Sequence, residues 1–339
     1  MDINDEIKDT LGLKKLDEIP NSVANGCISS GRGFHTEKGD IFVKNNKGND
    51  ALSMFVGEFN SLNAIRLTKT INAPKPLGIV QDPKSPGGAI VLEYHKMTRV
   101  TNWLELGSQL ADLHLFNSVL EKMKSKQQNW IGRPPKSDTP FTETVFKKEI
   151  KFKIDDEAAY QLDYVDQFGF EGATFCGKIA QNNEWHDNWI EFYARNRLDC
   201  QINLVIEKSG DREIIEYWSN LQLTLDRLFK EMRNPIKPSL LHGDLWSGNV
   251  SQVNDTPIIY DPASFYGHSE FELSITSLFC GFADDFYDSY FKKIPKEEGY
   301  EMRQELYKLF HTLNHWNHFG NYKRRTKDIM KKLIQYCTN

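Results

Sequence analysis

The chain has 339 residues, of which 39% are hydrophobic, 26% charged and 12% aromatic, and its formal net charge at pH 7 is −5. This composition excludes an intrinsically disordered chain, and the slight acidic excess argues against a protein that binds nucleic acid through a basic surface. The length corresponds to about two domains or lobes. No apolar run approaches the ~20 residues that a membrane-spanning helix requires, so we expect no membrane segment.

Cysteine spacing and the first residues of the chain favour a reducing compartment. The five cysteines are Cys27, Cys176, Cys200, Cys280 and Cys337, and none of them forms a CxxC pair. An odd number without paired spacing argues against a disulfide framework or a zinc site. Residues 1–6 are acidic and polar, unlike the basic and then apolar start of a signal peptide. We therefore expect a cytoplasmic protein.

Strand and helix patterns alternate in the first third of the chain. Glycines punctuate a predicted hairpin over residues 26–45, whose second half is a strand at 41–44. Apolar residues recur every three or four positions over 52–65, as in a helix with one buried face. Two more strands are predicted at 78–80 and 89–92, separated by a turn rich in Pro and Gly.

The remainder of the chain has mainly helical patterns. Helices are predicted at 103–123, 185–206, 211–232, 270–280, 300–316 and 326–336, and short strands at 239–242 and 257–260. Residues 124–158 are polar and irregular, and we interpret them as a mobile surface insertion. Basic residues are frequent over 323–332; a solvated helix face is the plain interpretation, and a patch for phosphate or an anionic partner is the alternative.

The most informative segment is the run 242–249, HGDLWSGN, which is followed by an apolar strand ending at Asp261. The pattern H-x-D-x4-N with a later Asp is typical of kinases. Phosphoryl transfer requires a carboxylate that orients the attacking hydroxyl and takes its proton, and hard oxygen ligands that hold magnesium on the phosphates. We assign Asp244 as the base, Asn249 and Asp261 as Mg2+ ligands, and ATP as the cofactor. The alternative is a loop Asp and Asn that only cap turns.

Residues upstream of this motif fit a nucleotide site. Lys44 ends a predicted strand, from which its ammonium would reach the α and β phosphates. Glu58 lies on the following predicted helix and is the expected partner of Lys44. Glu93, Tyr94 and His95 follow the buried strand at 89–92, where a hinge would offer backbone groups to adenine.

A glycine-rich hairpin is expected to cover the phosphates. Its segment 26–33, GCISSGRG, departs from the P-loop and from the G-x-G-x-x-G of protein kinases. The expected phosphate-binding residues, through backbone N–H groups and two hydroxyls, are Gly26, Ser29, Ser30 and Gly31. An ordinary glycine hairpin is the alternative. Cys27 lies in this hairpin near Arg32, and we consider its oxidation, to a disulfide-linked dimer that blocks ATP binding, against an inert small residue.

Two departures from protein kinases favour a small-molecule acceptor. Asp261 is followed by Pro262 and Ala263 instead of Phe and Gly, and Pro fixes the backbone at this point. An A-P-E motif and a long activation segment are also missing after Asp261. The sequence therefore shows no docking platform for an extended peptide.

The run 241–249, together with DPASFYGHSE at 261–270, resembles the fructosamine-3-kinase and ketosamine-3-kinase family. Supporting segments lie at 26–29, 184–189 and 313–320, and the resemblance extends over residues 20–335. It implies an α+β, bilobal protein-kinase-like fold of the aminoglycoside-phosphotransferase type. The β-rich N-lobe would cover 1–95 and bind the nucleotide, and the mostly helical catalytic and substrate C-lobe would cover 96–339.

The resemblance also implies ATP-dependent phosphorylation of the 3-hydroxyl of ketosamines, the adducts that form when sugars react with protein amines and rearrange. The 3-phosphate ester is unstable and its breakdown frees the amine, so the implied role is protein deglycation. The substrates would be glycated proteins or small ketosamines, as ribulosamines, fructosamines or both. The alternatives are a kinase of the same fold acting on an aminoglycoside or choline, and a non-catalytic pseudokinase, against which the full set of catalytic residues argues.

Three aromatic residues are candidates for the sugar site. Trp246, inside the catalytic loop, would stack on the C–H face of a sugar, with a core Trp as the alternative. His315 and His318 would reach sugar hydroxyls, with buried structural histidines as the alternative. We interpret His242, His268 and Glu272 as structural residues. We expect no nucleic-acid or membrane partner and a monomer, apart from the redox-dependent dimer through Cys27.

Overall fold

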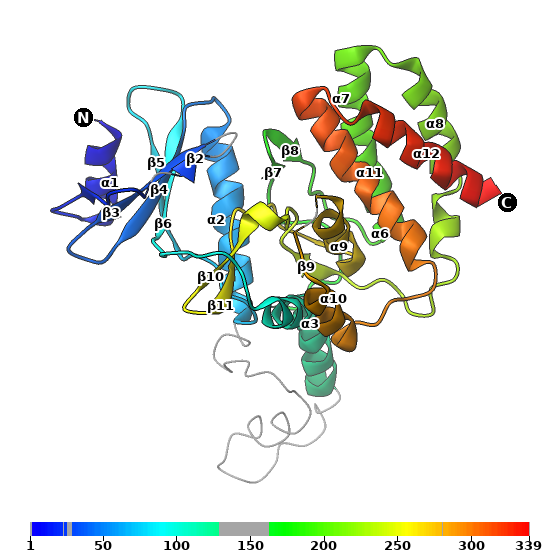
Figure 1. Ribbon diagram of the computed structural model, residues 1–339, viewed down its shortest axis with the longest axis horizontal. Helices are drawn as coiled ribbons and strands as arrows, with labels where there is room; N and C mark the ends of the chain where they lie inside the picture. Colours follow the sequence, from blue (N-terminus) through cyan, green and yellow to red (C-terminus); the bar gives the residue numbers. More distant parts are fainter. Residues whose placement is uncertain (1, 23, 26–28, 129–162, 280, 339) are drawn as a thin grey trace, which may run out of the picture.

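The computed structural model has a sheet-rich N-terminal region, drawn in blue and cyan, beside a helical C-terminal region (Figure 1). The structure describes residues 2–22, 24–25, 29–128, 163–279 and 281–338. Gly26 and Cys27 therefore lie outside the described residues, as does the predicted insertion from residue 129 onward. The predicted fold class, a β-rich N-lobe and a mostly helical C-lobe, is confirmed by this arrangement.

Six antiparallel strands form the N-terminal sheet, in the order β1-β3-β4-β6-β5 with β2 paired to β3. They are β1 (Asp17–Glu18), β2 (Ala24–Asn25), β3 (Ser30–His35), β4 (Ile41–Asn46), β5 (Pro76–Gln81) and β6 (Gly88–Glu93). Alternate residues of a strand face opposite sides of its sheet. Ile41 and Val43 of β4 join a small core with Ile7 of α1 (Ile3–Leu11). Lys44 consequently faces the other side, where α2 (Ala51–Thr68) packs.

Helix α1 is a part of the fold that the sequence interpretation missed. Its acidic start is a capping box, in which the Asp2 side chain accepts the N–H of Asp5 and the Asp5 side chain accepts that of Asp2. Gly12 ends the helix in the left-handed conformation, and Ile7 is fully buried against the sheet. The first residues therefore anchor α1 on the face of the sheet opposite to α2.

The C-terminal region consists of helices around three small hairpins or strand pairs. The helices are α3 (Trp103–Gln128), α6 (Trp189–Phe192), the π-helix η1 (Tyr193–Asp199), α7 (Cys200–Ser209), α8 (Arg212–Gln222), the 3₁₀-helices η2 (Leu225–Phe229) and η3 (Ser247–Asn249), α9 (Ser269–Leu278), α10 (Asp284–Lys293), α11 (Tyr300–Phe319) and α12 (Lys323–Thr338). The strand pairs are β7 (Thr174–Cys176) with β8 (Ile179–Gln181), β9 (Ser239–Leu241) with β12 (Phe265–Gly267), and β10 (Val250–Val253) with β11 (Thr256–Ile259).

Several predicted helix boundaries differ from those of the structure, and one helix was missed. Helix α3 continues to Gln128, so the predicted irregular segment does not begin at residue 124. The helix predicted from 185 begins at Trp189, because the Asn188 side chain accepts the N–H groups of Ile190 and Glu191 and caps it there. Helix α10 was not predicted at all, and it packs along α3.

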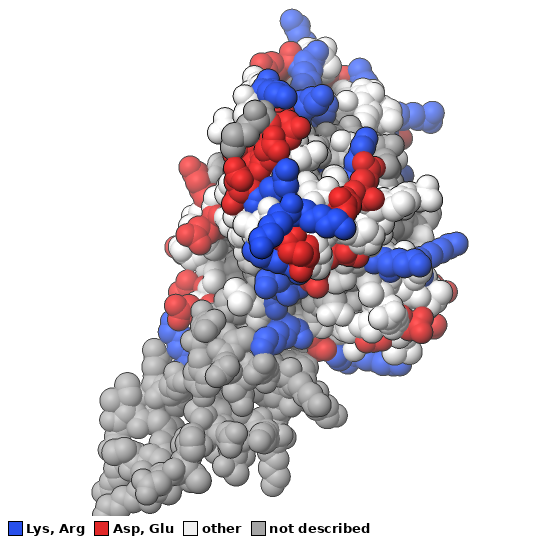
Figure 2. Space-filling view, turned by 90° about the vertical axis from the view of Figure 1, so that its left-hand side faces the viewer, with Lys and Arg blue, Asp and Glu red and all other residues white. Residues whose placement is uncertain are grey.

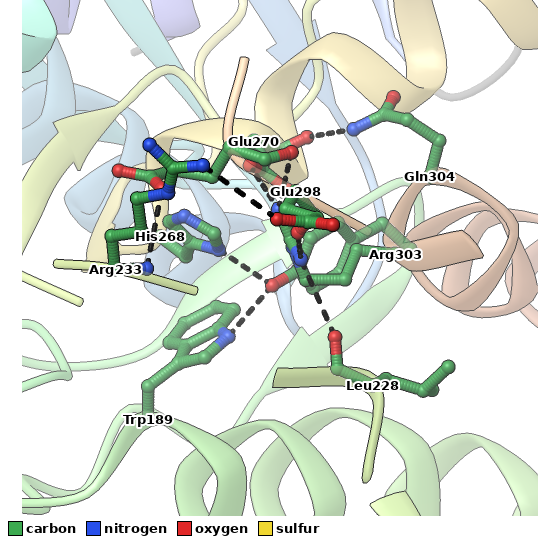
Figure 3. Close-up of polar contacts among 10 residues, drawn as sticks. Trp189, Leu228, Arg233, His268, Glu270, Glu298, Arg303 and Gln304 are labelled. Atoms are coloured by element: carbon green, nitrogen blue, oxygen red, sulfur yellow. Dashed lines mark hydrogen bonds and ion pairs between the residues drawn. The ribbon is translucent and has the colours of Figure 1, made fainter. Parts of the chain in front are cut away.

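A buried polar network joins α9 to α11 in the C-terminal core (Figure 3). Arg303 is fully buried and binds Glu270 through two 2.8 Å contacts, Nε to Oε2 and Nη2 to Oε1. The Tyr307 hydroxyl accepts a hydrogen bond from Trp189 Nε1 and contacts His268 Nδ1 at 2.7 Å. Breaking one partner of a buried ion pair is costly, so these contacts fix the position of α9. That helix also carries Glu272, which accepts backbone N–H groups from the loop over residues 242–249, called the catalytic loop below.

The surface agrees with the modest net charge. Figure 2 shows basic and acidic side chains interspersed over the face formed by the N-terminal region. Within the described ranges, every helix is too short or too polar to span a bilayer.

Candidate active site

Lys44, Glu58 and Asp261 meet where the two regions face each other. Lys44 Nζ lies 2.8 Å from Glu58 Oε2 and 3.0 Å from Asp261 Oδ1. Burial disfavours the charged form of Lys44, but the carboxylates of Asp261 and Glu58 outweigh it and raise the pKa of the ammonium above its ordinary value. The structure thus brings together three of the sequence-predicted residues, with Lys44 held as a cation in a mostly buried position.

Asp244 and Asn249 share the loop between β9 and β10. Asn249 Nδ2 donates to the Asp244 backbone carbonyl at 2.8 Å and lies 3.4 Å from Asp244 Oδ2. Burial raises the pKa of Asp244 to about 8, and the charges of Asp261 and Glu272 add to the rise. Such a concentration of negative charge favours the binding of a cation.

Glu272 of α9 binds the backbone of the catalytic loop. The two carboxylate oxygens of this fully buried residue accept the backbone N–H groups of His242 and Gly243. His242 contacts the Tyr260 carbonyl through Nε2 at 2.9 Å and is also fully buried. These contacts agree with the structural interpretation of both residues. Gly243 has φ +86°, and a Cβ here would lie 2.1 Å from the Ala263 carbonyl oxygen, so only glycine fits.

Asp261 has an unusual backbone for its position. Its φ is +57°, in the left-handed region, and the next residue is Pro262. Both the side chain at Asp261 and the following proline disfavour this conformation, so the surrounding structure must hold it. The N–H of Ala263 donates to the His242 carbonyl at 2.8 Å, which ties the segment after Asp261 to the catalytic loop.

The oxygen atoms of this site suit magnesium. The Asn249 amide nitrogen is turned toward Asp244, so its Oδ1 is the atom directed elsewhere. Asp261 uses Oδ1 for Lys44 and retains Oδ2. Carboxylate and amide oxygens are hard ligands, and Mg2+ in kinases takes its other ligands from water and phosphates. Among the described residues, no three His, Cys, Asp or Glu side chains form a metal site by themselves. Water and phosphates would therefore have to complete the coordination of Mg2+ here.

The described part of the glycine-rich segment, from residue 29 onward, lies beside Lys44. Gly31 pairs with Lys44 across β3 and β4, and a Cβ at Gly31 would lie 2.1 Å from the Phe42 ring. Ser30 pairs with Asn45 in the same ladder, and Ser29 directly precedes β3.

At the predicted hinge, two backbone N–H groups are engaged within the small lobe. The N–H of Glu93 donates to Lys75 O at 2.8 Å, and that of Tyr94 donates to Asp40 O at 3.1 Å. His95 contacts the Glu93 carboxylate at 3.5 Å through Nε2. The N–H groups of Glu93 and Tyr94 are therefore already bonded within the protein. Recognition of adenine here would have to use other backbone groups of residues 93–95.

The three predicted sugar-binding residues differ from one another in exposure and in hydrogen bonding. Trp246 is 41% exposed and is not a core residue. His315 is half-buried, donates from Nδ1 to the His311 carbonyl, and lies against Phe279 with ring centroids 4.6 Å apart. His318 has both ring nitrogens engaged, one by the Asn314 carbonyl and one by the N–H of Lys178.

Gly281, which follows α9 in the chain, packs against the loop that carries Trp246. A Cβ on Gly281 would lie 2.7 Å from the Cβ of Ser247, the neighbour of Trp246.

Sequence reasoning did not identify the β7–β8 hairpin as part of the site. A signal was present in Gly57, a glycine inside the α2 pattern and next to Glu58. Isolated glycine in a helix often marks a close approach of another backbone. A Cβ at Gly57 would lie 2.5 Å from the Ala173 carbonyl oxygen, just before β7.

Comparison with known proteins identifies the family of the chain. The sequence profile of the fructosamine kinase family matches residues 1–144 and 157–336. The chain is 45% identical to the ketosamine-3-kinase of Mus musculus over 329 residues, which is 96% of this chain and 98% of the mouse protein. It is 34% identical to the chloroplastic protein-ribulosamine 3-kinase of Arabidopsis thaliana over 302 residues, 88% of this chain and 77% of that protein.

Solved structures support the same fold. A protein described as a candidate fructosamine-3-kinase from Haemophilus somnus 129PT superimposes with a TM-score of 0.72 at 24% identity, covering 98% of this chain and 97% of that one. A mutant of the aminoglycoside phosphotransferase APH(4)-Ia, in ternary complex with AMP-PNP and hygromycin B, gives 0.53 at 14% identity over 98% of both chains. The extent of the family match and the identity to the mouse protein show that this chain belongs to the fructosamine kinase family.

Proposed function

We propose that the protein is an ATP- and Mg2+-dependent kinase that phosphorylates the 3-hydroxyl of ketosamines and so initiates protein deglycation. The observation that carries this proposal is the convergence of Lys44, Glu58, Asp244, Asn249 and Asp261 in one site of a chain closely related to a ketosamine-3-kinase. An aminoglycoside or choline acceptor is not favoured, because the named relatives act on ketosamines.

Each of these residues has a distinct task in the proposed reaction. ATP, with Mg2+ bound to its phosphates, supplies the phosphoryl group and neutralises the charge that develops on it. Lys44 binds the α and β phosphates, and Glu58 holds Lys44 in place. Asn249 and Asp261 hold the metal, while Asp244 orients the acceptor hydroxyl and takes its proton. Catalysis on this scheme is positioning and charge stabilisation, without a covalent enzyme intermediate.

The acceptor site is proposed to lie on the C-lobe side of Asp244. The exposed ring of Trp246 offers a stacking surface to the sugar, and His315 offers Nε2 to a sugar hydroxyl. His318, whose nitrogens are engaged, contributes by holding the β7–β8 turn. We further propose a cytoplasmic monomer, whose substrates are ribulosamines or fructosamines on proteins or small amines. The redox-dependent dimer through Cys27 remains a prediction.

The test is a comparison of three acceptors with Mg-ATP: a ribulosamine, a fructosamine and an aminoglycoside. ADP release measures turnover, and phosphorus NMR locates the new ester. We expect a 3-phosphate product from at least one ketosamine and none from the aminoglycoside. Turnover on the aminoglycoside alone, or an ester at another carbon, would overturn the proposal.

A further inference from the structure

The β7–β8 hairpin grips the backbone that follows Asp261. Thr174 Oγ1 donates to the Ser264 carbonyl at 3.2 Å, and Gln181 Nε2 donates to the Ala263 carbonyl at the same distance. Both side chains are buried, with exposures of 1% and 4%. Two side chains from one short hairpin thus satisfy two successive carbonyls close to the proposed metal ligand.

Helix α2 also binds the same backbone. Ser61 Oγ accepts the N–H of Ser264 at 3.1 Å and donates to the Gly57 carbonyl at 2.7 Å. Gly57 in turn approaches the backbone of Ala173. Helix α2 also carries Glu58, the partner of Lys44. The position of α2, the hairpin and the segment after Asp261 is therefore fixed by one set of contacts.

Asn183 links the hairpin to Arg197, a buried cation. Asn183 Nδ2 donates to Thr174 Oγ1 at 2.9 Å, and Asn183 Oδ1 accepts from Arg197 Nη2 at 2.7 Å. Arg197 is fully buried in the π-helix η1, with its guanidinium 4.0 Å above the Phe265 ring. Its hydrogen-bond partners in the described structure are neutral amide and carbonyl oxygens. This arrangement orients Asn183, and Asn183 orients the Thr174 hydroxyl.

The contacts of Thr174 and Gln181 hold the backbone directly after the strained residue Asp261. The left-handed backbone before Pro262 would relax if the following residues were free. We propose that Thr174 and Gln181 are positioning residues, which keep the Asp261 carboxylate aimed at the nucleotide-bound metal in place of a regulated activation segment. This inference rests on the proposed role of Asp261 as a Mg2+ ligand.

The test measures metal-dependent nucleotide binding instead of turnover. Thr174→Val removes the hydroxyl at nearly constant shape, and Thr174→Ser retains it. Thr312→Val is the matched control, because Thr312 is also fully buried and donates to a carbonyl, that of Leu309 in α11. For each protein, the Kd of a fluorescent ADP analogue is measured in EDTA and in saturating Mg2+. The ratio of the two values is the affinity gained from the metal.

We expect Thr174→Val to reduce this gain by roughly fivefold, the scale of one lost buried hydrogen bond. Thr174→Ser and Thr312→Val should keep the wild-type gain, although Thr312→Val lowers the melting temperature. An undiminished gain in folded Thr174→Val would refute the inference. If that variant does not fold, Gln181→Met removes the second donor, and an unchanged gain there has the same meaning. A wild type whose ADP affinity does not respond to Mg2+ would instead contradict the metal role of Asp261 in the proposed function.

Discussion

Lys44 and Asp261 are 217 positions apart in the sequence, yet Nζ of the first lies 3.0 Å from Oδ1 of the second. The contact joins β4 of the small lobe to the segment after β11 of the large lobe. Glu58 completes it from α2, so the ammonium has two carboxylate partners in a mostly buried position. Buried charges are tolerated only when paired in this way. The fold itself thus aligns Lys44, the proposed phosphate-binding cation, with Asp261, the proposed metal ligand.

Asp244→Asn should strongly slow phosphoryl transfer while sparing nucleotide binding. The amide still accepts and donates hydrogen bonds at this position, but it does not take the proton of the acceptor hydroxyl. General-base catalysis contributes about 10²- to 10⁴-fold, so we expect kcat to fall by that factor. The measurement is kcat on a ketosamine together with the Kd of ADP and a far-UV circular dichroism spectrum. A folded variant with undiminished kcat would exclude Asp244 as the base.

Glu272→Gln should lower both stability and kcat through the catalytic loop. Glu272 accepts two backbone N–H groups with two charged oxygens, whereas glutamine has one carbonyl oxygen and would turn an N–H toward a donor. Hydrogen bonds to charged groups contribute about 1.5–3 kcal/mol, and we expect a loss of that order in urea unfolding.

Glu301→Gln is the control for this change, because Glu301 is an exposed residue of α11 that pairs with Lys296. Its free energy of unfolding should change by less than about 0.5 kcal/mol. Equal effects of the two substitutions would mean that Glu272 does not support the loop.

Residues with a local signature were predictable from the sequence. The H-x-D-x4-N run places Asp244 and Asn249 in one loop, and strand periodicity places Lys44 on the face of the sheet opposite to Val43. The structure brings these residues together with Glu58 and Asp261 as the kinase pattern indicates. Lys44 lies within β4, which continues two residues past the predicted strand end, and Glu58 lies within α2. Asp244 and Asp261 lie in loops just after the short strands β9 and β11.

The supporting residues were not predictable, since their roles depend on tertiary contacts. Thr174 and Gln181 lie on strands of three residues each, too short for a periodic signal. Arg197 is fully buried and stacks on Phe265, which is 68 positions away, a contact that the local sequence does not indicate. His318 illustrates the converse: its motif suggested sugar binding, but its nitrogens are used by the backbone of Asn314 and Lys178.

Trp246→Ala should weaken acceptor binding with little effect on ATP. The ring is 41% exposed, on the loop that carries Asp244, and Trp246 is not among the residues proposed to bind the nucleotide. Loss of a stacking surface removes binding that ground state and transition state share, so KM for the ketosamine should rise roughly tenfold while kcat changes little. Tyr336→Ala, an aromatic residue of similar exposure near the end of α12, should leave KM unchanged. Equal KM values in the Trp246 variant and the wild type would remove Trp246 from the acceptor site.

Buried histidines should make the protein less stable in mild acid. His311 is 1% exposed beside Phe271 and Phe310, and burial lowers its pKa to about 3, with a smaller contribution from His315. In the unfolded chain an imidazole titrates near 6.5. Between these values the unfolded state binds more protons than the folded state, so the free energy of unfolding falls as the pH decreases. At pH 5 the loss from this one residue is about 2 kcal/mol.

His311→Leu should therefore flatten the decline of stability between pH 7 and pH 5, as measured by urea unfolding across that range. The decline should not vanish, because burial also lowers the pKa of His268 to about 3. Leu309→Ala, a substitution in the same helix, should cost about 2–5 kcal/mol at every pH and keep the wild-type slope. A His311→Leu slope equal to that of the wild type would show that His311 gains a proton in the folded protein as easily as in the unfolded chain.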